Sequence, residues 1–176
     1  RRRVVYGWRF SAEPPPINFM NDPRFRLTPE QAAELVDQFG TPLYVLDEET
    51  LRAKMRAYRQ AFGGRLSFAA KANPISAVLA IAHSEGFGVD VASEGELRSA
   101  LYGGVPAANC TLHGNNKSAD EIAYALVAGV GEIVVDNMTE LSRFVALDLV
   151  DTKLLLRLAP RGGGGTSPPA GPPPPR

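Results

Sequence analysis

Residues 65–74, Arg-Leu-Ser-Phe-Ala-Ala-Lys-Ala-Asn-Pro, hold a transition from strand to helix around which the rest of the chain is organised. Apolar residues alternate with small or polar ones up to residue 70, the period of two that is typical of a short strand. Asn73 followed by Pro74 predicts a helix N-cap and the first position of the next helix. Lys71 therefore lies where a strand ends, at the edge of an α/β sheet where ligands bind.

The position of Lys71 allows two interpretations. A lysine that follows an apolar strand can lose part of its hydration, which favours the neutral amine that forms a Schiff base with an aldehyde. The alternative is a solvated charge at the end of a strand, without a chemical role. Residues 65–74 alone leave both interpretations open.

The unit of one strand and one helix recurs along the chain at an even spacing. Each unit spans 21–23 residues, and the predicted strands begin near residues 42, 65, 88, 110, 132 and 153. Strands that alternate with helices at such a step predict right-handed βαβ units and a parallel sheet. Three helices in this pattern have the sequence of a capping box at their start, beginning at Thr28, Ser93 and Ser118.

The even spacing also bears on the kind of parallel sheet. An open doubly wound sheet usually has a glycine-rich phosphate turn after its first strand, and residues 47–50, Asp-Glu-Glu-Thr, are not such a turn. A (β/α)₈ (TIM) barrel suits the period better, and it needs eight strands and about 250 residues. We therefore predict an α/β fold, a partial TIM barrel with about six strands in this chain.

Composition divides the chain into three segments. Residues 1–26 show no period and carry three consecutive prolines, which predicts an N-terminal extension of low order. Residues 27–160 hold the strands and helices and are predicted to form the incomplete barrel domain. Residues 161–176 contain eleven glycines and prolines, which predicts a disordered or polyproline-like tail foreign to the barrel. The alternative for this tail is a proline-rich ligand for a partner.

The overall composition excludes several classes of function. Nineteen basic and nineteen acidic residues cancel, so no net charge draws the chain to nucleic acid or to a membrane surface. The single cysteine, Cys110, excludes an internal disulfide and a cysteine-based zinc site, and it fits a reducing compartment. The two histidines lack the spacing of metal ligands, so we predict no metal site. These features fit a protein of a reducing compartment such as the cytoplasm.

Polar residues follow the predicted strands, and in a barrel the carboxyl ends of all strands share one face. Asp90 lies inside an apolar strand, where an unpaired carboxylate is costly, so a structural and a site role stay open. His113 is either a core histidine or faces a ligand. Arg157 ends a leucine-rich strand, and a buried guanidinium needs an oxygen-rich partner. The other polar residues at strand ends are interpreted as helix caps: Asp47, Ser93 and Asp136.

Four motifs in order resemble the fold-type III pyridoxal-phosphate decarboxylases. They are residues 39–45 (Phe-Gly-Thr-Pro-Leu-Tyr-Val), 68–73 (Phe-Ala-Ala-Lys-Ala-Asn), 88–97 (Gly-Val-Asp-Val-Ala-Ser-Glu-Gly-Glu-Leu) and 113–118 (His-Gly-Asn-Asn-Lys-Ser). The last motif is more similar to the diaminopimelate decarboxylases of this family than to its ornithine or arginine decarboxylases. The resemblance runs from about residue 39 to residue 160.

The resemblance implies a site and a reaction. Pyridoxal 5'-phosphate would be held at the carboxyl-terminal mouth of the barrel, and Lys71 matches the lysine that binds it as a Schiff base. Asp90 and Arg157 match positions lining the cofactor pocket, and His113 and Asn115 match a turn in its wall. The implied reaction is the loss of carbon dioxide from meso-diaminopimelate to give L-lysine, in an enzyme that is a homodimer when complete.

The chain also departs from the family pattern. The family continues after the Arg157 strand with a histidine that stacks on the cofactor, a glycine-rich phosphate loop and a second domain, and this chain has none of these. We therefore expect the polypeptide alone to be inactive or unstable. Two alternatives stay open, an ornithine- or arginine-type decarboxylase of the same fold, and a non-catalytic truncated barrel or interaction module.

Overall fold

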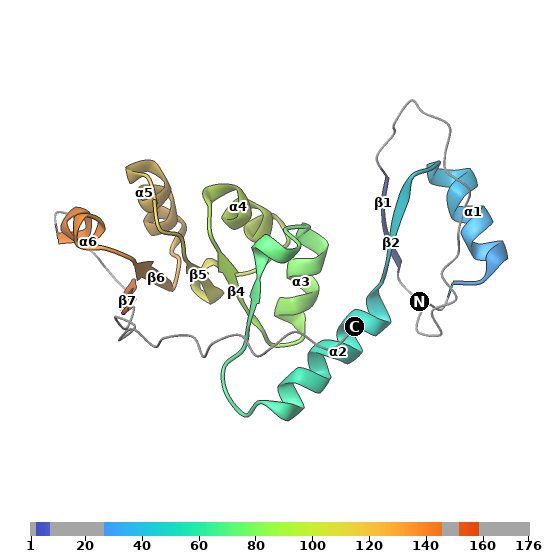
Figure 1. Cartoon of the computed structure of the whole chain (residues 1–176), viewed down its shortest axis with the longest axis horizontal. Helices are drawn as coiled ribbons and strands as arrows, with labels where there is room; N and C mark the ends of the chain where they lie inside the picture. Colours follow the sequence, from blue (N-terminus) through green and yellow to red (C-terminus); the bar gives the residue numbers. More distant parts are fainter. Residues whose placement is uncertain (1–2, 8–26, 146–151, 159–176) are drawn as a thin grey trace, which may run out of the picture.

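The parallel sheet that the sequence predicts forms the centre of the protein. The computed structural model describes residues 3–7, 27–145 and 152–158. Five strands pair in chain order and all run parallel (Figure 1). They are β3 (Ser67–Ala69), β4 (Gly88–Val91), β5 (Cys110–Leu112), β6 (Glu132–Val135) and β7 (Lys153–Leu156).

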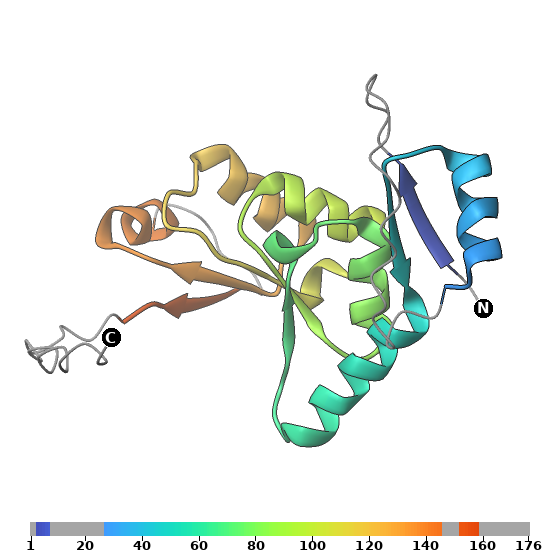
Figure 2. The same ribbon diagram turned by 45° about the vertical axis from the view of Figure 1, so that its right-hand side comes forward.

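Helices connect the neighbouring strands and lie along one side of the sheet (Figure 2). Successive right-handed crossovers between adjacent strands place their helices on the same side, as in a (β/α)₈ barrel. The α/β prediction of a partial barrel is confirmed in this arrangement. The helices are α3 (Ser76–Ser84), α4 (Glu94–Tyr102), α5 (Ala119–Ala128) and α6 (Met138–Val145), and two short 3₁₀ turns are η1 (Ala70–Ala72) and η2 (Ala107–Asn109).

The hydrophobic core lies between these helices and the sheet. In β4, Val89 and Val91 are fully buried, whereas Gly88 and Asp90 are only partly buried. Since side chains alternate along a strand, this places Asp90 on the opposite face of the sheet from the core. The largest buried side chains of the core are Leu79, Leu97, Leu112, Ile122, Ile133 and Phe144.

The helix starts follow the local sequence in most cases. Ser118 accepts a hydrogen bond from the Glu121 amide, and the Glu121 side chain accepts one from the Ser118 amide, so α5 begins with the predicted capping box. The same reciprocal pair, Thr28 with Gln31, starts α1 (Pro29–Phe39). Such pairs satisfy amide groups that have no partner within the helix.

The predicted start of the helix after Lys71 is wrong by two residues. The chain first makes the η1 turn, and α3 begins at Ser76 rather than at Pro74. Asn73 Oδ1 accepts a hydrogen bond from the Ile75 amide at 3.2 Å. An asparagine side chain that bonds the main chain two residues on closes a turn of its own, so here it delays the helix.

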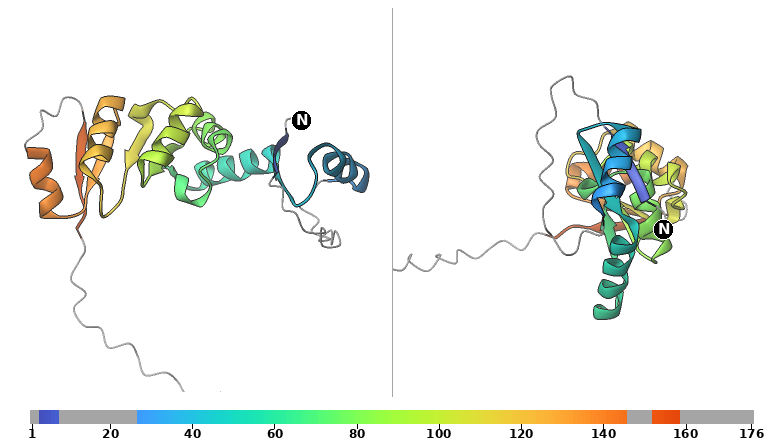
Figure 3. Two further views of the ribbon diagram at one scale, coloured as in Figure 1. Left: turned by 90° about the horizontal axis from the view of Figure 1, so that it is seen from above. Right: turned by 90° about the vertical axis from the view of Figure 1, so that its right-hand side faces the viewer.

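The first predicted strand belongs to a different sheet from the one expected. β2 (Leu43–Asp47) pairs antiparallel with β1 (Arg3–Gly7), and it makes no ladder with the parallel strands. α1 accompanies this pair, and α2 (Glu48–Ala61) leads from it to the parallel sheet (Figures 1 and 3). The parallel sheet therefore has five strands among the described residues, not six.

Residues 3–7 correct part of the prediction for the N-terminal extension, since they form a strand. Their sequence, Arg-Val-Val-Tyr-Gly, is rich in residue types that favour strands, and β2 supplies the partner. Residues 8–26 and the tail 161–176 lie outside the described residues, so the extension and the tail otherwise stay predictions. Among the described helices, none is both long enough and apolar enough to cross a bilayer.

Candidate functional site

A cavity of about 460 Å³ lies at the carboxyl ends of the parallel strands. Its volume falls within the range of about 300–1,000 Å³ that is common for small-molecule sites. Side chains from the ends of all five parallel strands line it, and these include every site residue that the sequence predicts. The polar residues of the lining are Lys71, Asp90, Glu96, His113, Asn115, Asp136 and Arg157.

Lys71 reaches this cavity from the η1 turn that follows β3. Ala70, just before it, is completely buried and fixes the turn against the core. The Lys71 side chain is exposed, which differs from the partial loss of hydration that the apolar strand suggests, because the strand ends at Ala69 and Lys71 lies beyond it. In the described part of the chain, its amine forms no ion pair or hydrogen bond, so it is available to a ligand.

Asp90 and His113 form a pair in the wall of the cavity. The His113 amide donates to the Val91 carbonyl at 2.7 Å, which continues the β4–β5 pairing and turns the imidazole toward Asp90. His113 Nε2 lies 3.5 Å from Asp90 Oδ1, and both side chains are about one-third exposed. His113 is therefore not enclosed in the core, and the carboxylate of Asp90 has a polar neighbour on the cavity side.

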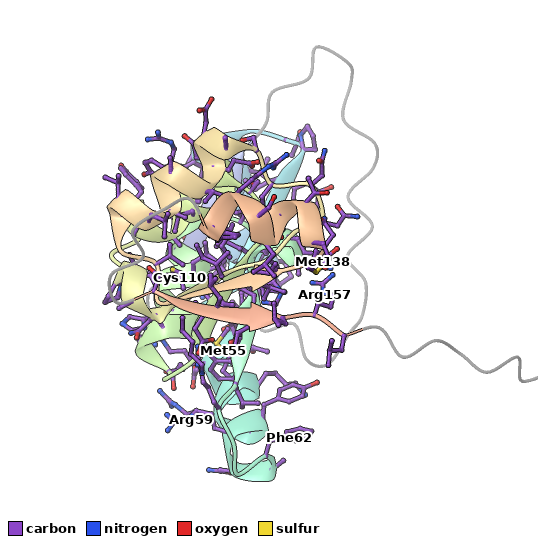
Figure 4. All side chains as sticks on the ribbon, turned by 90° about the vertical axis from the view of Figure 1, so that its left-hand side faces the viewer. Met55, Arg59, Phe62, Cys110, Met138 and Arg157 are labelled. Atoms are coloured by element: carbon purple, nitrogen blue, oxygen red, sulfur yellow. The ribbon has the colours of Figure 1, made fainter. Side chains whose placement is uncertain are left out.

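Asp136 and Arg157 form a second pair, across the ends of β6 and β7. Arg157 Nη1 lies 2.8 Å from Asp136 Oδ1 as an ion pair, and no described group donates a hydrogen bond to that buried oxygen. The oxygen-rich partner expected for Arg157 is thus Asp136, although the guanidinium is half exposed rather than buried. Figure 4 shows Arg157 beyond the tip of β7, at the opposite end of the sheet from Cys110.

The interpretation of Asp136 as a helix cap is wrong. Asn137 accepts the hydrogen bond from the Glu140 amide at 2.8 Å, so the next residue does the capping and leaves the Asp136 carboxylate to the cavity. The register could have indicated this, since Val135 pairs with Leu156 and the following residues of both strands are oppositely charged. The sequence alone therefore suggested a helix cap for Asp136, whereas the structure places this residue in the lining of the cavity.

The other two predicted caps are confirmed. Asp47 Oδ1 accepts from the Thr50 amide at 3.0 Å at the start of α2. Ser93 Oγ accepts from the Glu96 amide at 3.3 Å at the start of α4, so Ser93 caps this helix. The capping box predicted there is only half formed, because the Glu96 side chain does not bond the Ser93 amide. Glu96 also lines the cavity, but its Oε2 accepts from the Ala92 amide at 2.7 Å, which assigns this carboxylate to the main chain at the end of β4.

The turn after β5 completes the wall with Gly114 and Asn115. Gly114 has a φ of +112°, and a Cβ added there would lie 3.2 Å from the Ala92 carbonyl oxygen. The positive φ favours glycine at this position, and the close approach to Ala92 adds to the cost of any side chain. The turn therefore packs directly on the end of β4 and presents Asn115 to the cavity.

The described residues provide neither a nucleophilic cysteine nor a metal site. Cys110 is fully buried in β5, where burial first and the charge of Asp90 second raise the pKa of its thiol to about 11. Such a thiol is a poor nucleophile at neutral pH. Among the residues that the structure describes, no three histidine, cysteine or acidic side chains gather closely enough to hold a metal ion.

The residues present fit pyridoxal phosphate. The cavity has a primary amine at its rim, a guanidinium and an amide that can donate to anionic oxygens, and the otherwise unpartnered oxygen of Asp136 that can accept from a protonated ring nitrogen. Lys71, Arg157, Asn115 and Asp136 supply these groups.

Comparisons with known proteins point to the same cofactor. Residues 48–169 match the family model for the pyridoxal-binding domain of pyridoxal-dependent decarboxylases. The chain is 45% identical over 116 residues to diaminopimelate decarboxylase from Mycobacterium tuberculosis, an alignment that covers 65% of this chain. It covers 26% of that protein, so the chain spans about a quarter of the length of this relative.

Solved structures of this group share the fold. Lysine/ornithine decarboxylase from Vibrio vulnificus complexed with cadaverine has a TM-score of 0.67 and 34% identity, over 74% of this chain and 35% of that one. Diaminopimelate decarboxylase from M. jannaschii in co-complex with L-lysine has a TM-score of 0.54 and 32% identity, over 64% of this chain and 28% of that one.

Proposed function

Because this chain belongs to the family of the pyridoxal-binding domain of pyridoxal-dependent decarboxylases, we propose that its cavity binds pyridoxal phosphate and serves the decarboxylation of an amino acid. The observation that carries the proposal is the gathering of Lys71, Asp90, His113, Asn115 and Arg157 around one cavity. These residues come from four separate strand ends, and the sequence predicts each of them as a site residue.

The side chains have separate roles in this proposal. Lys71 would hold the cofactor, since its amine can condense with an aldehyde with the loss of water. Arg157 and Asn115 donate hydrogen bonds to anionic oxygens, and Asp136 keeps the guanidinium of Arg157 directed at the cavity. Asp90 orients His113 from 3.5 Å. The bound cofactor supplies the electron sink for the electron pair left when carbon dioxide departs.

The finer proposal concerns the substrate, which we take to be meso-diaminopimelate, with L-lysine and carbon dioxide as products. It is supported by the curated relatives, among which the diaminopimelate decarboxylase from Mycobacterium tuberculosis is 45% identical over 116 residues. The solved structures do not separate the two substrates, since the identity is 32% to a diaminopimelate decarboxylase and 34% to a lysine/ornithine decarboxylase. An ornithine- or arginine-type substrate is the alternative. The homodimer and the cytoplasmic location that the resemblance implies stay predictions for the longer protein.

A second candidate function is cofactor binding without turnover. It is supported by the span of the match, since the chain covers 26% of the length of its relative and the rest of that protein is available to contact substrate. In this case the chain would form the Schiff base with the cofactor and release no carbon dioxide. We expect this behaviour of the 176-residue chain by itself.

The test is trapping of the cofactor on Lys71. Purified chain is mixed with pyridoxal phosphate, its visible absorbance is recorded, and borohydride is added before peptide mapping. The expected result is a phosphopyridoxyl adduct on the peptide containing Lys71, and its loss in Lys71→Ala. Lys54→Ala, which removes an exposed lysine of α2, is the matched control and should keep the adduct. An adduct spread over several surface lysines would contradict the proposal, and carbon dioxide release from meso-diaminopimelate separates turnover from binding alone.

A further inference from the structure

The most enclosed ion pair of the described residues lies behind the cavity. Lys117 Nζ is 3.0 Å from Glu140 Oε1, and their side chains are only 1% and 3% exposed. Lys117 belongs to the turn after β5, and Glu140 belongs to the first turn of α6. Neither residue is part of the cavity lining at the strand ends.

Taking two charges out of water is costly, and a buried pair offsets that cost only when its remaining polar atoms are also satisfied. Here the extra hydrogen bonds go to the main chain of cavity residues. Lys117 Nζ donates to the Gly114 carbonyl at 2.6 Å, and Glu140 Oε2 accepts from the Asp136 amide at 2.8 Å. One ion pair therefore joins two separate parts of the cavity wall.

Further contacts fix both members of the pair. Arg143 Nη1, from α6, donates to the Lys117 carbonyl at 2.7 Å. Asn137 Oδ1 accepts from the Glu140 amide and so sets where α6 begins. Gly114 in turn packs on the Ala92 carbonyl at the end of β4. The network thus reaches from the end of β4 through the turn after β5 to the end of β6.

We propose that Lys117 and Glu140 are positioning residues for the cavity. Their pair fixes the main chain at Gly114 and Asp136, and this sets the separation between Asn115 on one wall and the Asp136 carboxylate on the other. They act through these residues and touch no ligand themselves. The inference rests on the proposed binding of pyridoxal phosphate, and it names the residues that give that site its shape.

The alternative is that the pair only stabilises the fold, and the chemistry of its hydrogen bonds separates the two roles. A swap of the charges, K117E with E140K, restores an ion pair but neither main-chain bond. The carboxylate introduced at position 117 cannot donate to the Gly114 carbonyl, and the ammonium introduced at position 140 cannot accept from the Asp136 amide. An apolar replacement, K117M with E140M, keeps the volume without the charges, and such replacements are often neutral for stability.

The experiment measures two quantities in the full 176-residue chain. One is the dissociation constant of pyridoxal phosphate from an absorbance titration, and the other is the midpoint of urea unfolding. Both double variants should bind pyridoxal phosphate at least tenfold more weakly than the wild type, and the apolar variant should lower the unfolding midpoint less than the charge swap does. The matched control is Glu85→Gln, which disrupts a buried carboxylate paired with Arg52 and Arg56, remote from the cavity. It should lower the midpoint and leave the dissociation constant unchanged.

Wild-type affinity in either double variant would overturn the proposal. It would mean that the shape of the cavity depends only on the charges of the pair or only on the volume of its side chains, and not on the two main-chain hydrogen bonds. If both double variants fail to fold, the variant Glu140→Gln tests the proposal instead. The carboxylate of Glu140 uses one oxygen for Lys117 and the other for the Asp136 amide, whereas the amide side chain of glutamine has only one acceptor oxygen. The expected readout is a shift of the Asp136 or Gly114 amide resonance together with weaker binding, and unchanged resonances would overturn the proposal. If the wild type itself binds no pyridoxal phosphate, the proposed function fails, and the same resonances still decide the positioning role.

Discussion

Arg157 Nη1 lies 2.8 Å from Asp136 Oδ1 and joins the ends of two neighbouring parallel strands. The two residues differ in their surroundings, because the Asp136 side chain is 17% exposed and that of Arg157 is 46% exposed. The pair is therefore intermediate between a surface ion pair and a buried one. It holds a guanidinium at the edge of the cavity without removing it from solvent.

The coupling between these two side chains is measurable. In a double-mutant cycle with Asp136→Asn and Arg157→Gln, we expect a coupling free energy of about 1 kcal/mol, the upper end for partly exposed pairs. The reference is the Glu94–Arg98 pair on the surface of α4, for which about 0.3–0.5 kcal/mol is expected. Urea unfolding of the four proteins in each cycle gives both values. A coupling free energy no larger than that of the α4 pair would contradict the description of Asp136 and Arg157 as more than a surface ion pair.

Gly114 should tolerate no side chain. Gly114→Ala meets both an unfavourable φ of +112° and the Ala92 carbonyl oxygen at 3.2 Å, so we expect a loss of about 2–3 kcal/mol in the free energy of unfolding. Gly129→Ala is the matched control, because its φ is +81° and a Cβ there meets nothing within 4 Å. It should cost about 1 kcal/mol. Equal losses in the two variants would mean that packing on β4 is unimportant.

The docking of α2 on α3 should depend on pH through Glu85. Hydrogen bonds from Arg56 and then Arg52 lower the pKa of this carboxyl from 4.5 to about 2. A pKa that is lower in the folded state stabilises the fold above the unfolded pKa, and this contribution is lost as the pH falls from about 5 to 2. Unfolding midpoints measured across this range should therefore fall with pH.

Glu85→Gln should remove most of that dependence, and at pH 7 it should cost about 2 kcal/mol, as for hydrogen bonds to charged groups. Glu34→Gln, at an exposed position of α1, is the control and should leave the pH profile unchanged. The same acid dependence in Glu85→Gln as in the wild type would place its origin at other carboxyl groups.

The structural features that the sequence predicts correctly depend on residues that are close together in the chain. The capping box of Ser118 with Glu121 joins positions three apart, and the alternation of Val89 and Val91 with Asp90 is a property of one strand. The parallel strands could be predicted for the same reason, because each unit of one strand and one helix is complete within about 22 residues. Lys71 and Arg157 could be placed at the edge of the sheet because both lie within two residues of the end of such a strand.

The features that were missed depend on contacts between distant segments. β2 has the sequence of a strand, but its partner is set by β1, which lies at the other end of a long connection. Asp136 and Asn137 are adjacent and both can cap a helix, and only the packing of α6 decides which of them does. Lys117 lies in a polar turn that resembles a solvated loop, and its burial requires Glu140 from the next unit. Sequence periodicity does not carry this information.

The strand order of the parallel sheet has a consequence for the way the protein is made. Each strand from β4 to β7 pairs with the strand synthesised just before it. Every unit of this sheet can therefore dock on its predecessor while the ribosome is still adding the next one, whereas β1 has to await β2. Docking can therefore proceed from the amino-terminal side during synthesis, while the outer edge of β3 and that of the most recent strand stay unpaired.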